Sequence, residues 1–299
     1  MTKKITSLAS SIALLLAAAI WGFGFVVVKD SLDYIGAVWM MAFRFTIAAA
    51  ALAFLYGRKL KNITRKTCFH GLILGLYLFI AYLVQTIGCN YTTAGKNAFL
   101  TTIYVFFIPV FLWIIDRRRP AWYVFLCAIM SVTGIGMLAL GTGDTGAVNI
   151  GDILTLICGI FYAIHIIFTS KYDKYHDPIL LTLLQFFAVT IFSWIFAPFY
   201  DGAFPIEQIQ NSRVILSMVY LGFFATMMCF IFQNVGLKYL PSTWASLLLS
   251  FESVFGVIFS VILLGEKLTL RMGFGCALIF TAVVLAQILP EIIEKRKQK

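Results

Sequence analysis

Charged residues are scarce in this chain of 299 residues. Asp, Glu, Lys and Arg together make up 12% of the sequence, whereas hydrophobic residues make up 61%. A soluble domain of this size exposes much more charge on its surface, so the composition excludes an ordinary water-soluble fold. The apolar residues come in runs of about 20, which is the length of helix that crosses a hydrocarbon core about 30 Å thick.

The motifs of common enzyme and metal sites are also missing. The six cysteines form no CxxC pair and do not cluster with histidine, so we interpret them as small apolar filler. The sequence contains no HExxH, GxSxG or Walker motif. Residues 141–144 read GTGD, as in aspartyl intramembrane proteases, but no span supplies the second aspartate that this chemistry needs. We therefore expect neither an enzyme nor a bound metal or cofactor.

Ten apolar segments are long enough to be transmembrane helices, and helices are required because lipid offers no partner for unpaired backbone groups. The first segment continues to Val28 without a break, which favours a membrane span over a cleaved signal peptide. The sequence thus predicts an all-α membrane protein with ten transmembrane helices. The predicted spans are Ala9–Val28, Gly36–Tyr56, Cys68–Gly88, Asn97–Ile115, Ala121–Leu140, Ile153–Ser170, Ile179–Phe199, Val214–Gly236, Ser242–Leu264 and Met272–Leu289.

The distribution of basic residues predicts the orientation. With the N-terminus inside, 17 Lys and Arg residues fall in inside segments, five in outside segments and one, Arg44, within a span. Cytoplasmic segments of membrane proteins carry such an excess of Lys and Arg. The sequence therefore predicts a multi-pass protein of a bacterial inner (plasma) membrane with both termini in the cytoplasm. These loops account for the net charge of +10, and no nucleic-acid partner is expected.

The chain contains an internal repeat. Residues 83–100, LVQTIGCNYTTAGKNAFL, align with residues 231–248, IFQNVGLKYLPSTWASLL, at a separation of 148. We predict two five-helix repeats, residues 1–145 and 146–299. Because five is an odd number, the two repeats must cross the membrane in opposite directions. Inverted repeats of this kind are a design of transporters, in which the two halves expose a shared site to each side in turn.

Several segments carry a family resemblance. They are IWGFGF at 20–25, NYTTAGKNAFLTTIYVFFIPVF at 90–111 with the following DRRRP, GDIL at 151–154, and SFESVFGVIFSVILLGEKLT at 250–269. In these segments the chain resembles the drug/metabolite transporter superfamily, in its EamA-like (RhaT-like) branch. The resemblance covers almost the whole chain and implies ten helices, transport of small metabolites, often export, and no metal or nucleotide cofactor. Ser253 departs from the pattern, because many relatives have proline after the glutamate, and we expect a less kinked helix there.

Glu252 is the most informative single residue. It lies ten residues into its predicted span, about 15 Å deep and close to the middle of the hydrocarbon core. A carboxylate at this depth is costly unless it is paired, hydrated or protonated. Two interpretations stay open: Glu252 binds a substrate amine or carries a coupling proton, or it belongs to a permanent structural ion pair. Tyr104 occupies the matching position in the first repeat and supplies a hydroxyl to the same region.

Arg44 and His165 are two further ionisable residues within spans. Arg44 lies about 12 Å into the second span, where it matches Gln185 of the second repeat. It either binds Glu252 or a substrate carboxylate, or it braces the helices through backbone carbonyls or an acidic partner such as Asp33, and the bracing role is favoured. His165 is a lone imidazole, for which a hydrogen-bonded core role is favoured over a proton relay.

Other polar and aromatic side chains predict a central cavity between two mirrored gates. The polar residues expected to line it are Gln85, Asn97 and Thr101 toward the outside, and Gln233, Asn234 and Ser246 toward the inside. Hydrogen bonding between neighbouring helices is the alternative role for each of them. The aromatic residues expected to stack on an aromatic or cationic substrate are Trp21, Tyr82 and Trp244. Packing at the lipid interface is the default alternative for these three.

Together these observations predict a secondary transporter that moves small organic metabolites, such as amino acids or related compounds, by alternating access. Export is preferred over uptake by analogy with the family. A multidrug efflux transporter is the alternative within this class, and a non-transporting membrane receptor or scaffold is the alternative outside it. The expected partners are a small-molecule substrate, the lipid bilayer and protons as the coupling ion. A homodimer is left open, although the GxxxG pair Gly71 and Gly75 favours packing inside the bundle.

Overall fold

The computed structural model describes residues 2–92, 94–117, 119–139, 149–264 and 270–297, and every regular element within these residues is helical. Six of the described helices are long and apolar enough to cross a membrane, and three further apolar helices are shorter. The prediction of an all-helical membrane protein is confirmed, whereas the count of ten spans stays a prediction. The GTGD stretch and the boundary between residues 145 and 146 lie outside the described residues.

The helices follow the chain in the order α1 (Thr2–Ser31), α2 (Ala37–Tyr56), η1 (Gly57–Asn62), α3 (Arg65–Tyr91), α4 (Ala94–Thr101), α5 (Tyr104–Asp116), α6 (Trp122–Ala139), α7 (Ile150–Tyr172), α8 (Pro178–Tyr200), η2 (Gln208–Gln210), α9 (Ser212–Val219), η3 (Tyr220–Met228), α10 (Cys229–Tyr239), α11 (Ser242–Leu249), α12 (Phe251–Leu264) and α13 (Leu270–Lys297).

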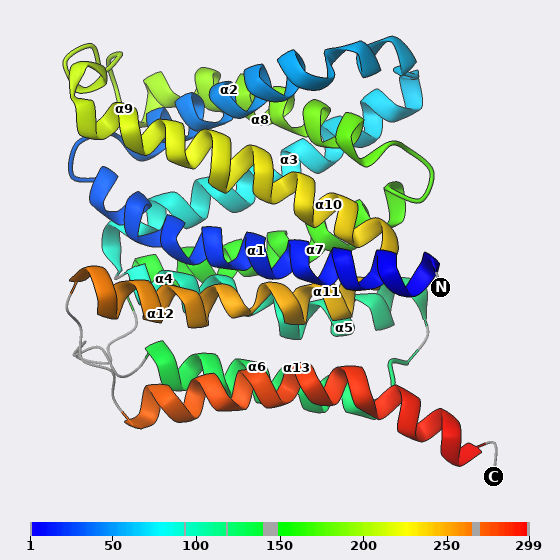
Figure 1. Ribbon diagram of the computed structural model, residues 1–299. Helices are drawn as coiled ribbons and strands as arrows, with labels where there is room; N and C mark the ends of the chain where they lie inside the picture. Colours follow the sequence, from blue (N-terminus) through cyan, green and yellow to red (C-terminus); the bar gives the residue numbers. More distant parts are fainter. Residues whose placement is uncertain (1, 93, 118, 140–148, 265–269, 298–299) are drawn as a thin grey trace.

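Figure 1 shows these helices lying side by side along a common direction. The start of α1 and the end of α13 lie at the same end of the bundle, which we call the terminal end. The turn between α1 and α2, residues 32–36, lies at the opposite end, which we call the turn end. α6 and α13 pack together along one edge of the bundle, and α2 and α8 pack together near the other.

α1 and α7, the first helices of the two predicted repeats, run in opposite directions. Near the end of α1, the ammonium group of Lys29 donates to the carbonyl oxygen of Cys89 (2.8 Å), which lies near the end of α3. The neighbouring Gly88 packs against Gly151 at the start of α7, so closely that a Cβ on Gly88 would lie 2.9 Å from the Gly151 carbonyl oxygen. α1 therefore ends where α7 begins, which is the arrangement that an inverted repeat requires.

Two of the predicted spans are interrupted inside the bundle. α4 and α5 are separated at residues 102–103, and α11 and α12 are separated at Ser250. In each break a hydroxyl bonds back to its own helix: Thr102 Oγ1 donates to Ala98 O, and Ser250 Oγ donates to Leu247 O, both at 2.7 Å. Such bonds offer the backbone an alternative to the regular helix. The two breaks lie 148 residues apart, the separation of the repeat, although the apolar runs of the sequence pass through both without a signal.

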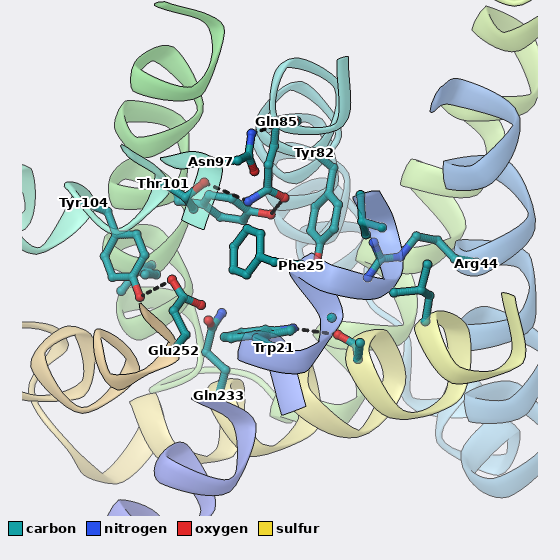
Figure 2. Close-up of a pocket in the computed structure, with 16 residues that line it drawn as sticks. Trp21, Phe25, Arg44, Tyr82, Gln85, Asn97, Thr101, Tyr104, Gln233 and Glu252 are labelled. Atoms are coloured by element: carbon teal, nitrogen blue, oxygen red, sulfur yellow. Dashed lines mark hydrogen bonds between the residues drawn. The ribbon is translucent and has the colours of Figure 1, made fainter. Parts of the chain in front are cut away.

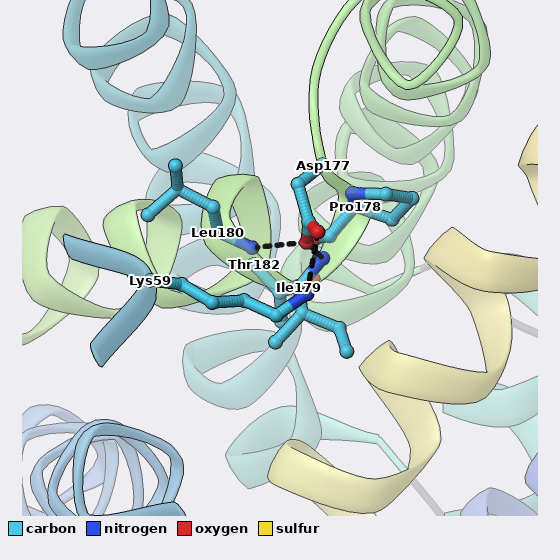
Figure 3. A network of polar contacts seen from close by, with 6 residues as sticks. All are labelled: Lys59, Asp177, Pro178, Ile179, Leu180 and Thr182. Atoms are coloured by element: carbon cyan, nitrogen blue, oxygen red, sulfur yellow. Dashed lines mark hydrogen bonds and ion pairs between the residues drawn. The ribbon is translucent and has the colours of Figure 1, made fainter. Parts of the chain in front are cut away.

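The first turn of α8 is capped by the residue that precedes it (Figure 3). Asp177 Oδ1 accepts hydrogen bonds from the backbone N–H groups of Ile179 (2.9 Å) and Leu180 (3.1 Å). Asp177 Oδ2 forms an ion pair with Lys59 of η1. Burial opposes ionisation of this carboxyl, but Lys59 and the two N–H donors outweigh burial and hold the pKa of Asp177 below its usual value.

The first turn of α2 is capped by a residue that lies just beyond the end of another helix. Asp201 follows α8, and its Oδ2 accepts hydrogen bonds from the backbone N–H groups of Val38 (2.7 Å) and Trp39 (2.8 Å). Gly36 stands where α8 has Asp177, and a Cβ at Gly36 would collide with the Asp201 carboxylate. α2 and α8 thus form an antiparallel pair that is tied by polar contacts at both ends of the bundle.

The GxxxG pair of α3 packs inside the bundle. Gly71 faces Leu184 and Gly75 faces Ala188, and both of these partners lie on α8. The interpretation that this motif serves packing within one chain is confirmed.

Candidate functional site

A cavity lies inside the bundle where helices of both predicted repeats meet (Figure 2). It encloses about 590 Å³ of empty space, including the part that is open to solvent. The residues that line it are Trp21, Gly24, Phe25, Val28, Arg44, Tyr82, Gln85, Asn97, Thr101, Tyr104, Tyr162, Ile166, Leu221, Ala225, Gln233 and Glu252.

Glu252 lies at the start of α12, beside both helix breaks. It is 4% exposed, and its Oε1 accepts hydrogen bonds from Thr102 Oγ1 (3.1 Å) and Tyr104 Oη (3.2 Å). Thr102 also shares a hydrogen bond with Ser253 (3.0 Å), so the two broken helices are joined at this point. No Lys or Arg side chain of the described residues forms an ion pair with Glu252. The alternative of a permanent structural ion pair therefore finds no support among the described residues.

A chain of amide and hydroxyl groups forms the wall of the cavity toward the turn end. Gln85 Nε2 donates to Thr101 Oγ1 (3.0 Å), and Tyr162 Oη donates to Gln85 Oε1 (3.3 Å). Asn97 Nδ2 donates to the carbonyl oxygen of Gln85 (3.1 Å) and to Thr155 Oγ1 (2.9 Å). These bonds fix the side chains of α3, α4 and α7 relative to one another, so this wall is a connected polar surface.

Trp21 joins α1 to the π-helix η3. Its indole Nε1 donates to the carbonyl oxygen of Ala225 (2.6 Å), and its ring lies edge-on to Phe230 with 5.4 Å between centroids. A π-helix departs from the regular hydrogen-bond ladder and is frequent at functional sites. Trp21 therefore lies at the cavity, where the sequence predicted it, and not at the lipid interface.

Arg44 lies on the opposite side of the cavity from Glu252 (Figure 2). Its Nε donates to Thr226 Oγ1 of η3 (3.0 Å), and its guanidinium carbon lies 4.8 Å from the centroid of the Tyr82 ring. Neither Asp33 nor Glu252 forms an ion pair with Arg44 within the described residues, and the hydrogen bond to Thr226 joins α2 to η3, which agrees with the favoured bracing role.

Four of the predicted site residues do not line the cavity: His165, Asn234, Trp244 and Ser246. His165 Nε2 and Gln185 Oε1 share a hydrogen bond of 2.6 Å, and Asn234 Nδ2 donates to Thr182 Oγ1 (2.7 Å). Ser246 Oγ donates to the carbonyl oxygen of Thr243 (2.9 Å), and Trp244 packs against the hydrophobic core. His165 and Asn234 thus hold neighbouring helices together, which is the alternative role stated for them, whereas Ser246 bonds within its own helix α11.

Sequence reasoning missed seven cavity residues: Gly24, Phe25, Val28, Tyr162, Ile166, Leu221 and Ala225. Three of them, Phe25, Tyr162 and Ile166, had a signal in the repeat. When the alignment is extended to the first helix of each repeat, at a separation of 141, Trp21 matches Tyr162 and Phe25 matches Ile166. The remaining four are small or aliphatic, and no pattern in the sequence separates them from lipid-facing residues.

The cavity offers little that would hold a metal ion. The described residues contain no group of three or more His, Cys, Asp or Glu placed to do so. The charged side chains in the lining are one carboxylate, Glu252, and one guanidinium, Arg44. Aromatic walls with a few convergent polar groups are typical of sites for small organic molecules.

Comparison with known proteins gives the family. The model of the EamA-like transporter family matches the chain twice, over residues 8–140 and 149–287. The chain belongs to the EamA-like transporter family. Two proteins of Archaeoglobus fulgidus, each named "Uncharacterized transporter", are similar to this EamA-like chain. One is 35% identical over 294 residues, covering 95% of the chain and 87% of the relative, and the other is 24% identical over 277 residues, covering 92% and 97%.

The fold also has a counterpart among solved structures. A crystal structure of a protein that is 15% identical superposes with a TM-score of 0.76 and covers 95% of this chain and 98% of that one. This EamA-like protein is therefore a multi-pass membrane transporter, as its resemblance predicted. The two relatives are archaeal, so they do not test the prediction of a bacterial inner membrane.

Proposed function

We propose that this EamA-like protein is a secondary transporter that moves small organic metabolites by alternating access. In this proposal ten spans form two inverted five-helix repeats, residues 1–145 and 146–299, in an inner (plasma) membrane with both termini in the cytoplasm. Alternating access needs one site between two matched units, so that each unit opens the site to its own side in turn.

The pairing of cavity residues across the repeats is the observation that carries this proposal. The pairs in the lining are Trp21 with Tyr162, Phe25 with Ile166, Gln85 with Gln233, and Tyr104 with Glu252. Both members of each pair line the same cavity, although they lie 141 or 148 residues apart. A site built from matching positions lies between the repeats, where a rocking motion would expose it alternately.

Glu252 is the residue to which we assign coupling. The two hydroxyl donors, Thr102 and Tyr104, both bond to its Oε1. Its Oε2 is then the acceptor for a substrate ammonium group or for a proton. Because Glu252 lies directly after the break at Ser250, a change of angle between α11 and α12 would move the carboxylate, and interrupted helices of this kind form the ion and substrate sites of other transporters.

The substrate class follows from the lining. Aromatic walls from Trp21, Phe25 and Tyr162 suit an apolar or aromatic body, and Glu252 and Arg44 suit polar ends. Amino acids or related amphipathic compounds combine these features. Export from the cytoplasm is the proposed direction.

Purified protein in sealed vesicles tests this function. Vesicles loaded with a labelled pool of small metabolites should release a subset of it when a proton gradient is imposed, and vesicles without protein should not. The matched control is Tyr104→Phe, which removes one hydroxyl from Glu252 and is expected to keep most of the flux, whereas Glu252→Gln is expected to abolish the response to the gradient.

Two outcomes would change the assignment. If no compound crosses the bilayer under any ion gradient but compounds still bind, the protein is a membrane receptor or scaffold. If the released compounds are unrelated lipophilic drugs and no metabolite is among them, the multidrug efflux alternative is correct.

A further inference from the structure

Arg44 carries a buried positive charge within α2, one of the six helices able to cross a membrane. The residue is 4% exposed. Its Nε donates to Thr226 Oγ1 (3.0 Å), and its guanidinium lies over the face of the Tyr82 ring at 4.8 Å. Within the part of the chain that the structure describes, no carboxylate lies close enough to form an ion pair with it.

One hydroxyl and two aromatic rings, those of Tyr82 at 4.8 Å and Phe45 at 5.8 Å, are little compensation for a guanidinium. The side chain has five N–H donors, of which the described contacts use the one on Nε. A cation–π contact stabilises a cation only weakly, whereas an unpaired charge inside a membrane protein is costly. Arg44 also lines the cavity, and Figure 2 shows it facing the space bounded by Tyr82, Phe25 and Trp21. Its terminal nitrogens are thus placed to meet an anion that enters the cavity.

The matching position of the second repeat holds a residue that braces two neighbouring helices. Gln185 matches Arg44, and it is fully buried with a hydrogen bond of 2.6 Å to His165. The position that matches His165 in the first repeat is Gly24, where a Cβ would meet Ala225 at an ordinary 3.7 Å. The second repeat therefore fills this space with an imidazole, whereas the first repeat leaves it open beside Arg44.

We infer that Arg44 binds the carboxylate of an organic substrate that carries a single carboxylate, and makes the cavity prefer carboxylic acids over their amides. This inference rests on the proposed transport function, because it names the substrate class of the same site. A planar guanidinium matches a carboxylate with two parallel hydrogen bonds. The lining offers one guanidinium and, on the other side, the acidic Glu252, so its charge suits a single negative charge better than a phosphate dianion.

Calorimetry on the purified full-length protein in detergent tests the inference without transport. The probes are two matched pairs, 3-phenylpropionate with 3-phenylpropionamide and L-phenylalanine with L-phenylalaninamide. Each acid should bind the wild-type chain about tenfold more tightly than its amide, which corresponds to about 1.4 kcal/mol. Arg44→Gln should remove this preference. Arg44→Lys keeps the charge but cannot form two parallel hydrogen bonds, so it should retain part of the preference.

Matched variants separate recognition from damage to the fold. Arg213→Gln removes an exposed arginine outside the cavity lining, and the acid preference should be unchanged. Thr226→Val removes the hydrogen bond to Nε but leaves the charge, so the preference for acids should persist at lower affinity. If Arg44→Gln does not fold, the comparison of Arg44→Lys with the wild type carries the test, because a loss of the bidentate contact should reduce the preference.

The outcomes distinguish this inference from the transport function. Equal affinity of acid and amide for the wild-type chain, or no binding of either acid at millimolar concentration, overturns the role of Arg44. An acid preference that depends on Arg44 in detergent, combined with vesicles that move no solute, would overturn transport and leave the anion site standing.

Discussion

The cavity has different surroundings toward the two ends of the bundle, although the chain repeats itself. At the level of Tyr104 and Glu252, both repeats contribute matching residues to the lining. Toward the turn end the cavity continues beside Gly24 and Val28 of α1. Toward the terminal end the matching helix, α7, has His165, which is buried and hydrogen-bonded. The repeated backbone creates a shared site, and the size of individual side chains decides how each side of it is filled.

A second difference concerns how the first helix of each repeat is held at its end. At the turn end, Lys29 donates to the carbonyl oxygens of Cys89 (2.8 Å) and Thr92 (3.0 Å). At the terminal end, the matching residue of α7 is Ser170, whose hydroxyl donates to Leu237 at 3.4 Å. A charged donor forms the stronger hydrogen bond, so the two ends of the bundle are held unequally.

The largest expected effect comes from the pair that both repeats share. Glu252→Gln keeps the size of the side chain and its acceptor oxygen for Thr102 and Tyr104, but it carries neither a charge nor an exchangeable coupling proton. We expect transport in vesicles to fall about 100-fold, or about 2.7 kcal/mol, and to lose its dependence on pH. Tyr104→Phe should lower the flux about threefold or less. Equal losses of flux in Glu252→Gln and Tyr104→Phe would show that the two positions are functionally equivalent, and this would contradict the assignment of coupling to Glu252.

An intermediate effect is expected at the ends of α1 and α7. Lys29→Met removes charge-assisted hydrogen bonds from a half-buried position and should lower the free energy of unfolding by about 1–2 kcal/mol. Ser170→Ala removes one long hydrogen bond and should cost about 0.5 kcal/mol or less. Thermal unfolding of both variants in the same detergent measures the difference. A larger loss for Ser170→Ala would reverse the inequality between the two ends.

An effect at the lower end of that expected for Lys29→Met is expected at the caps of α2 and α8. Asp201→Ala and Asp177→Ala each remove a helix cap, worth about 1 kcal/mol. Gly36→Ala should destabilise the wild type by displacing Asp201 but should have little further effect in the Asp201→Ala background. Additive losses in this double-mutant cycle would show that Gly36 serves another purpose.

The two caps also differ in a way that pH can reveal. Because the pKa of Asp177 is lowered in the folded protein, its ionised form stabilises the fold at pH values above the pKa of an unfolded aspartate. This contribution is lost as the pH falls through the lowered pKa of the folded state. The stability difference between the wild type and Asp177→Ala should therefore shrink in acid, and a difference that stays constant down to the acid limit of folding would contradict the ion pair with Lys59.

The architecture was predictable because it depends on composition and on repetition. Apolar runs indicated membrane helices, and the repeat placed Tyr104 and Glu252 in one cavity. Depth in a span was the useful signal for Glu252, because a carboxylate there is too costly to be accidental. The same argument found Arg44, although two of the partners suggested for it, Asp33 and Glu252, are not paired with it in the described residues.

What the sequence could not predict depends on local packing. The breaks at Thr102 and Ser250 arise from hydroxyl groups that bond to their own helix, and a hydroxyl in an apolar run does this in some contexts and not in others. His165 was expected to be a core group, and its hydrogen bond to Gln185 agrees with this. The matching residue of the first repeat, Gly24, lines the cavity, and this depends on how the two repeats pack around it.

Access from the two sides of the membrane tests the central claim most directly. Val28→Cys and Thr169→Cys place single thiols at matching positions of α1 and α7, in a chain whose six native cysteines are replaced. In sealed vesicles, a membrane-impermeant thiol reagent should reach position 28 from the side of the turn end in the resting protein, and position 169 should be protected. A transported substrate should expose position 169 from the opposite side while protecting position 28. Reaction at both positions under all conditions, or no change with substrate, would contradict alternating access between the two repeats.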